Sequence, residues 1–142
     1  MGTGHGNTCV SFDRSGKFLL VTRYWESGVS VLPWNPADGT IGEVCCAPQH
    51  SGSGPHPLRQ SIPHPHGIHA DPVSDIIYAM DLGNDKVVQY TLEASGNLAP
   101  LSEVDMGPES GPWQTKHSPL HSLRPRSRGA GGKEDIEANL II

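Results

Sequence analysis

The same pattern of residues occurs twice in this chain of 142 residues, and this duplication restricts the possible folds more than any other feature. The first copy runs from Phe12 to Val44 and the second from Ala70 to Val104. When the copies are aligned, Asp13 corresponds to Asp71. Two apolar stretches and a glycine also correspond: Phe18–Leu20 with Ile76–Tyr78, Val29–Val31 with Val87–Gln89 and, after a shift of one residue, Gly39 with Gly96. Each copy is therefore a series of short β-rich stretches separated by turn residues, without helical periodicity.

The second copy predicts four strands, at His66–Ala70, Ile76–Met80, Lys86–Leu92 and Leu98–Val104. Turns at 71–75 and 81–85 and a glycine-containing hairpin loop at 93–97 join them. The first copy divides in the same way, with its last hairpin loop at 34–39. A repeat of four short strands is the signature of a β-propeller blade, and a propeller closes with four to eight blades. We therefore predict an all-β fold over residues 1–112, a partial β-propeller of about two four-stranded antiparallel blades packed face to face, whose open faces need further blades as partners.

Composition and charge exclude several classes of function. The formal net charge of −5 gives no basis for binding nucleic acid or an anionic membrane. No apolar stretch approaches the length of a membrane span, and residues 1–10 lack the basic and apolar regions of a secretory signal. The three cysteines, with Cys45 and Cys46 adjacent, do not form a disulfide framework. We therefore expect a protein of the reducing cytoplasm.

The segment between the two copies, residues 49–66, is the richest in reactive side chains. Five of the eight histidines lie in it or just after it: His50, His56, His64, His66 and His69. Its prolines and glycines exclude a helix. In an antiparallel blade, the connection to the next blade and the turn between the second and third strands lie at the same end of the sheet. We therefore expect Arg59, His64 and His66 to lie near Asp81, Asn84 and Asp85, at the mouth of a central channel.

This segment resembles the lactonase family of seven-bladed propellers, which contains bacterial 6-phosphogluconolactonases and fungal carboxymuconate cyclases. Family members carry G-S-G-P-N-x-x-R-Q, then P-H-x-H, then D-L-G-x-D after a pair of strands. This chain has His56 at the Asn position and retains the other motif residues, which include Arg59, Gln60, His64, His66, Asp81, Gly83 and Asp85. The resemblance covers about residues 3–112. It implies a sugar-lactone hydrolase of the 6-phosphogluconolactonase type, acting without a cofactor in carbohydrate metabolism through the pentose phosphate pathway.

The resemblance ends abruptly after Pro112. The family continues with an Arg-His pair and another blade, whereas this chain continues with Trp113 and a basic segment that lacks the alternation of a strand. We therefore predict that residues 113–142 are an unrelated, irregular tail. A basic tail that binds an acidic partner is the alternative. Since family pockets also take residues from later blades, we expect residues 1–142 alone to have impaired activity.

The chemistry of a phosphorylated sugar lactone or a carboxylate fits the residue types in this segment. Arg59 offers a permanently charged fork for an anion. His64 or His66 can accept a proton from an attacking water or donate one to the leaving alkoxide. We assign catalysis to His64, His66 and Arg59, and binding of the small anionic substrate to Arg59, Gln60, Asp81 and Asp85.

Each assignment has an alternative that the sequence leaves open. Arg59 can simply hold the loop, the two histidines can be packed channel residues, and Asp81 and Asp85 can be turn residues. His64, His66 and His69 also form H-x-H-x-x-H, from which two side chains and Asp81 offer ligands for zinc, but His69 should point away from His66. We expect no metal. At the level of function, a carboxymuconate cyclase-like enzyme and a non-catalytic propeller fragment are the alternatives to the hydrolase.

Overall fold

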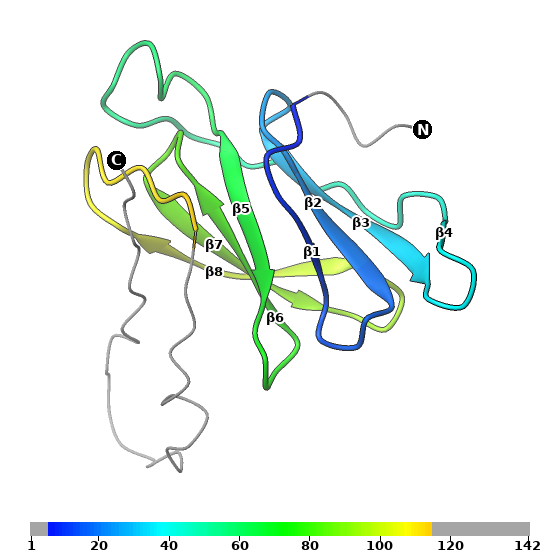
Figure 1. Cartoon of the computed structure of the whole chain (residues 1–142). Helices are drawn as coiled ribbons and strands as arrows, with labels where there is room; N and C mark the ends of the chain where they lie inside the picture. The colour runs from blue at the N-terminus through cyan, green and yellow to red at the C-terminus, as the bar shows by residue number, and fades with distance from the viewer. Residues whose placement is uncertain (1–5, 115–142) are drawn as a thin grey trace, which may run out of the picture.

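The computed structural model describes residues 6–114, and they form two four-stranded antiparallel sheets (Figure 1). The first sheet contains β1 (Val10–Phe12), β2 (Phe18–Arg23), β3 (Gly28–Asn35) and β4 (Thr40–Ile41). The second contains β5 (Pro65–Ala70), β6 (Ile76–Asp81), β7 (Lys86–Leu92) and β8 (Leu98–Asp105). Residues 6–114 contain no helix. The predicted all-β fold with two propeller blades is confirmed, while residues 115–142 of the tail predicted at 113–142 lie outside the described residues.

The strands of the second sheet follow the sequence prediction closely, and those of the first depart from it in one place. β4 is only two residues long, yet the chain beyond it stays beside β3, where isolated bridges join Val31 to Cys46 and Gly28 to Gln49. The pairing register slips by two residues between Ile41 and Cys46, so the fourth strand of this blade is interrupted by a bulge. The outer strand therefore leads directly to residue 50 at one end of the sheet.

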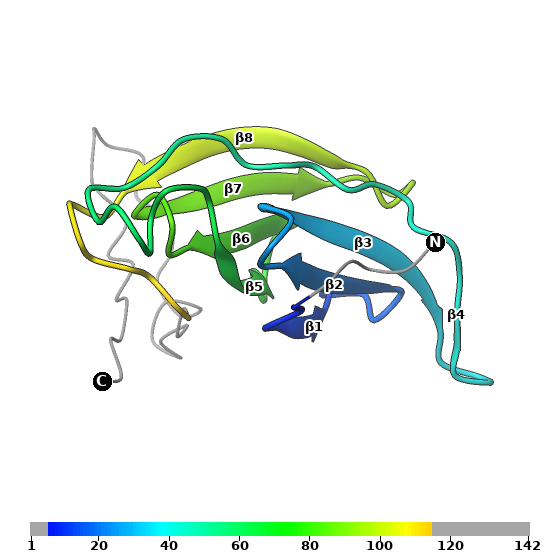
Figure 2. The same cartoon turned by 90° about the horizontal axis from the view of Figure 1, so that it is seen from above.

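The two sheets pack face to face through a shared apolar core (Figure 2). Because strand side chains alternate between faces, Leu20 points into this core while Leu19 and Val21 lie on the opposite face. The residues of the shared core are Leu20, Val29, Val31, Ile68, Ile77, Ala79, Val88, Tyr90 and Leu98. The inner strands β1 and β5 are also joined by a hydrogen bond from Ser11 Oγ to the Ile68 carbonyl, 2.7 Å long. The blades are therefore one packed unit.

Each sheet has a second apolar face on the side away from the other blade. Leu19, Val21 and Leu32 form this face in the first sheet. Tyr78, Met80 and Val87 form it in the second. In a propeller each blade packs between two others through faces of this kind. Among the described residues, no helix is long and apolar enough to cross a membrane.

Candidate functional site at one end of the blades

The loop 50–64 and the turns at 24–27 and 82–85 meet at one end of the two sheets, which lies at the top of Figure 1. The hydroxyl of Ser27 donates to the Pro63 carbonyl oxygen over 2.8 Å, so the β2–β3 turn of the first blade contacts this loop. The Leu82 amide donates to the His64 carbonyl oxygen over 3.1 Å, so the β6–β7 turn of the second blade does too. The predicted gathering of these segments at one end is what the structure shows.

Asp81 holds both ends of the loop 50–64. Its side chain is fully buried, and one oxygen, Oδ2, lies 2.5 Å from His50 Nδ1, where the loop begins. The other oxygen, Oδ1, accepts hydrogen bonds from the amides of His64, where the loop ends, and Gly83, at 2.8 and 2.9 Å. The His50 side chain is only 1% exposed. One buried carboxylate therefore closes a loop of about a dozen residues, which fixes the positions of His64 and its neighbours.

Asp85 organises the middle of the loop and the segment that follows β8. Gln60 Nε2 donates to Asp85 Oδ1 over 2.7 Å and to the Leu82 carbonyl oxygen over 2.9 Å. The same carboxylate accepts hydrogen bonds from the amides of Glu109 and Gly111, each 2.8 Å long. The residue that carries it has φ 57°, a conformation that Asp tolerates better than most residues. This arrangement brings residues 109–113 against the site.

His64 and His66 lie in a run of aromatic rings. The His64 ring stacks on Tyr24 with centroids 4.3 Å apart, and its Nδ1 lies 3.1 Å from the Tyr24 carbonyl oxygen, as expected for an N–H donor. The His66 ring stacks on Trp113 with centroids 4.6 Å apart. Its Nδ1 is buried and has no hydrogen-bond partner among residues 6–114. Burial lowers the pKa of His66 below its ordinary value of 6.5, so this imidazole is neutral at pH 7.

Arg59 lies on the outer surface of the loop, with its side chain exposed. Its amide donates to His56 Nδ1 over 3.2 Å, so the local turn fixes its backbone and leaves the guanidinium open to solvent. Among the predicted site residues, His64 and His66 therefore both contact Tyr24, and Arg59 lies at the solvent-exposed rim of the loop. Gln60, Asp81 and Asp85 are buried, and their side chains form hydrogen bonds within the protein. Residues 6–114 contain no cluster of three or more His, Cys, Asp or Glu side chains arranged to hold a metal ion.

Four residues of this end were not singled out from the sequence: His50, Tyr24, Trp25 and Trp113. The position of His50 offered a usable signal, because it is the first residue after the outer strand and Asp81 is the last residue of β6. Both positions fall at the same end of the blades. Trp113 was missed because the resemblance recognised from the sequence motifs ends at Pro112, so that Trp113 was assigned to the tail.

Comparison with known proteins agrees with this architecture. A family model described as a lactonase with a seven-bladed β-propeller matches residues 1–122. The chain is 33% identical to the 6-phosphogluconolactonase of Bacillus subtilis over 112 residues, which cover 79% of this chain and 30% of that enzyme. It is 29% identical to the 6-phosphogluconolactonase of Yersinia pestis over 118 residues, which cover 82% of this chain and 32% of that enzyme.

Solved structures also match. The periplasmic gluconolactonase of Pseudomonas aeruginosa superposes with a TM-score of 0.71 at 32% identity, over 78% of this chain and 32% of that one. A protein from Lactobacillus plantarum superposes with a TM-score of 0.70 at 30% identity, over 78% of this chain and 31% of that one. This chain therefore spans about a third of the length of these relatives. The duplicated blades, the R-Q-x-x-P-H-x-H segment and these matches together establish that the chain belongs to the lactonase family of seven-bladed β-propellers.

Proposed function

We propose that this chain supplies two blades of a lactone hydrolase of the 6-phosphogluconolactonase type and carries one wall of its substrate site. The observation that carries this proposal is the His64–His66 pair, fixed at the end of the blades where Arg59 is exposed on the loop 50–64. The names of the relatives from Bacillus subtilis and Yersinia pestis support the reaction type.

The chemistry follows from the state of His66. Its ring is neutral at pH 7 and can accept a proton from a water molecule as that water attacks the lactone carbonyl carbon. The attack places negative charge on the carbonyl oxygen, which nearby donors must stabilise. The ring C–O bond then breaks as the imidazolium returns its proton to the leaving alkoxide. The product is a carboxylic acid, which loses its remaining proton to solvent and becomes the carboxylate. His64, which is 4% exposed and packed on Tyr24, is the second candidate for this acid–base role.

Arg59 binds the anionic group of the substrate in this proposal, because its guanidinium is exposed at the rim. Gln60, Asp81 and Asp85 were predicted to bind substrate. Their side chains are buried and hydrogen bonded to the loops, so we assign them to binding through the loop positions that they fix. The remaining contacts of the pocket come from blades beyond these two, and we propose that residues 1–142 alone have impaired activity.

We place the protein in the cytoplasm. The three cysteine thiols, Cys9, Cys45 and Cys46, are unpaired. Burial raises the pKa of the Cys46 thiol, which keeps it protonated and unreactive. Unpaired thiols suit a reducing compartment. The Pseudomonas aeruginosa relative is periplasmic, so fractionation of cells that express this protein decides between the two compartments.

A chimera tests the proposed function. Residues 1–113 replace the matching blades of the Bacillus subtilis enzyme, so that the Trp113 ring beside His66 is retained. The chimera and the chain 1–142 are assayed for hydrolysis of 6-phosphogluconolactone and, in parallel, for carboxymuconate cyclisation. We expect hydrolysis by the chimera only. Arg59→Ala and His66→Ala should each lower its rate by about 100-fold, the usual range for an acid–base or anion-binding group.

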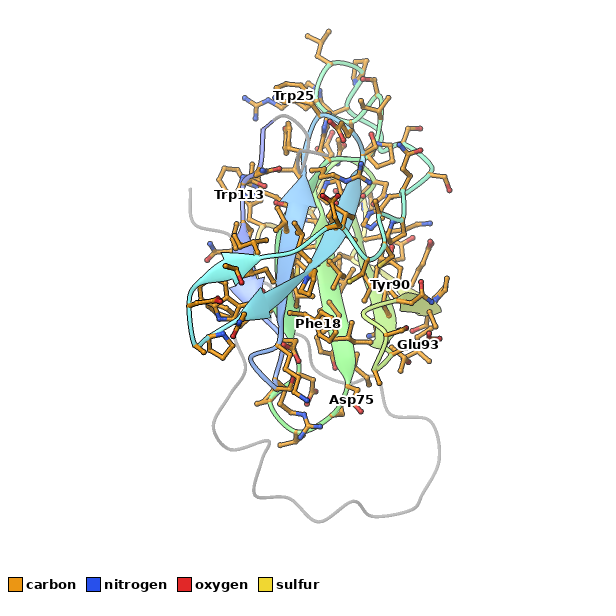
Figure 3. The ribbon with its side chains drawn as sticks, turned by 90° about the vertical axis from the view of Figure 1, so that its right-hand side faces the viewer. Phe18, Trp25, Asp75, Tyr90, Glu93 and Trp113 are labelled. Atoms are coloured by element: carbon orange, nitrogen blue, oxygen red, sulfur yellow. The ribbon has the colours of Figure 1, made fainter. Side chains whose placement is uncertain are left out.

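Arg14→Ala is the matched control, because Arg14 is also an exposed arginine but lies at the opposite end, paired with Asp75 (Figure 3). A folded chimera that cyclises carboxymuconate and leaves the lactone intact contradicts the proposal. Equal effects of Arg59→Ala and Arg14→Ala contradict the role of Arg59.

A further inference from the structure

A run of aromatic rings at the end of the blades extends beyond the two histidines on both sides. Trp25 stands edge-on to Tyr24, with centroids 4.8 Å apart, and edge-on to His64 at 5.5 Å. Tyr24 lies flat on His64 and edge-on to His66, which in turn stacks on Trp113. The two tryptophans are therefore the ends of a continuous run whose middle holds the candidate acid–base residues.

The end members are the exposed ones. Trp25 is 65% exposed and Trp113 is 43% exposed, although large aromatic side chains are usually mostly covered. In Figure 3 both lie above Phe18 and Asp75, with Trp25 near the top and Trp113 lower and to the left. Neighbouring blades in a propeller pack against sheet faces rather than sheet ends. Trp25 lies in the turn between β2 and β3, at such an end, so further blades leave its ring uncovered.

A glycine lies in close contact with each tryptophan residue. A methyl group at Gly67, the residue after His66, would overlap the Trp113 carbonyl oxygen, so only glycine lets this backbone approach β5. A methyl group at Gly6 would overlap the Trp25 indole. Asp85 holds the segment just before Trp113 through the Gly111 amide. These contacts hold the backbone of Trp113 against β5, and stacking on His66 places its ring in the site.

We propose that the aromatic rings between Trp25 and Trp113 form a stacking surface for the C–H face of a pyranose ring beside His66, which selects a cyclic sugar over an open-chain dicarboxylate. This inference rests on the proposed function and names its substrate class. The face of an indole ring carries partial negative charge, so it attracts the weakly positive C–H hydrogens of a sugar ring. The same face repels a carboxylate, just as it attracts a cation. The anionic group of the substrate therefore lies away from the rings, toward Arg59.

Indole N–H signals in nuclear magnetic resonance spectra test the proposal, because the chain has only three tryptophans. Trp34, which packs edge-on to Phe12 on the first blade, is an internal control. The uniformly ¹⁵N-labelled chain 1–142 is titrated with D-glucose, cis,cis-muconate and inorganic phosphate, each to about 50 mM, where a ligand of millimolar Kd occupies most sites. We expect glucose to shift the signals of Trp25 and Trp113 and leave Trp34 unmoved, and the two anions to shift none of them.

Variants sharpen the result. Trp113→Ala should weaken glucose binding about threefold to tenfold, the size of one aromatic contact, while Trp113→Phe retains most of it. Gly67→Ala, which displaces Trp113, should act like Trp113→Ala. Unmoved Trp25 and Trp113 signals with glucose overturn the proposal, as does an equal shift of Trp34 or a response to muconate or phosphate. Signals that move with protein concentration instead identify a self-association surface and also overturn it. Since this readout needs no turnover, loss of hydrolysis in the chimera with intact glucose binding rejects only the proposed reaction.

Discussion

Replacing Asp81 with Asn removes one negative charge from the most enclosed hydrogen-bond network of the molecule. Asn retains one side-chain oxygen, so the amides of His64 and Gly83 keep their acceptor. In the native protein, Oδ2 of Asp81 accepts a hydrogen bond from His50 Nδ1 over 2.5 Å. In the variant, the NH₂ group of Asn faces that nitrogen, so two donors meet. His50 escapes this clash only by moving its proton to Nε2. That nitrogen is buried and has no partner among residues 6–114, so a buried donor is left unpaired in either case.

The magnitude follows from this count of hydrogen bonds. A hydrogen bond to a charged group contributes about 1.5–3 kcal/mol, and an unpaired buried donor costs about 1–3 kcal/mol. Because the two effects overlap, we expect Asp81→Asn to lower the free energy of unfolding by about 2–4 kcal/mol, a large part of the usual total of about 5–15 kcal/mol. Asp81→Ala also leaves the His64 and Gly83 amides without an acceptor and should be more damaging still.

Urea unfolding followed by tryptophan fluorescence measures the effect. With a slope of about 1–3 kcal/mol per molar urea, the midpoint of Asp81→Asn should fall by about 1–3 M at an unchanged slope. Asp75→Asn is the matched control, because Asp75 forms only an exposed ion pair with Arg14 at the opposite end, and it should leave the midpoint where it is. An Asp81→Asn midpoint equal to that of Asp75→Asn refutes this account of the loop. Additive effects of Asp81→Asn and His50→Gln refute the coupling between the two side chains.

Three further predictions concern the pH dependence and the close backbone contacts. The His66 ring should titrate below pH 6.5 in nuclear magnetic resonance spectra, and Trp113→Ala should move its pKa back toward 6.5, because burial is what lowers it. Since the unfolded chain takes up this proton first, stability should fall as the pH drops below 6.5, and a His66 pKa at or above 6.5 contradicts the assignment. Gly83→Ala should lower the free energy of unfolding by about 1–3 kcal/mol and speed hydrogen exchange at 62–64, because a methyl group at Gly83 overlaps the Ile62 carbonyl oxygen. A methyl group at Gly16 meets no atom, so Gly16→Ala should leave exchange at 62–64 unchanged. Partial burial raises the pKa of Asp13, but the four hydrogen bonds that its carboxylate accepts hold the pKa below 3.8. The stabilisation by this carboxylate is therefore present above pH 3.8 and lost as the pH falls through the lowered pKa. Asp13→Asn should thus reduce the difference in stability between neutral and acidic solution.

The fold could be predicted from the sequence because the two copies repeat local chemistry. Asp13 and Asp71 occupy the same position in the turn between the first and second strands, where each accepts hydrogen bonds from amides two or more residues further on. Period-two alternation in β2 and β6 supplies an apolar residue to both faces of each sheet. The bulge that shortens β4 was not predictable in this way. It depends on how residues 42–46 fit beside β3, which no local pattern encodes.

The candidate site could be predicted only as far as strand order determines it. Antiparallel connectivity places the loop 50–64 and the turn 82–85 at one end, and the structure agrees. It does not determine which side chains turn inward. Gln60 lies next to Arg59, yet the Gln60 amide reaches Leu82 and Asp85 inside the molecule while the Arg59 guanidinium faces solvent. Adjacent residues in an irregular loop follow no period, so their burial depends on contacts made far along the chain.

The hydrogen bond between His50 and Asp81 shows why the contacts within this site could not be predicted from the sequence. Thirty-one positions separate the two residues, and no sequence motif predicts that they are in contact. The outer strand of the first blade ends beside β3, and the second strand of the next blade ends beside β5, so the packing of the two blades brings both strand ends together. A carboxylate enclosed at that junction needs donors, and it takes them from the two ends of the connecting loop. The residue that bears the carboxylate therefore supports the site through the junction between blades, and its effect on His64 should persist in any chimera that preserves this junction.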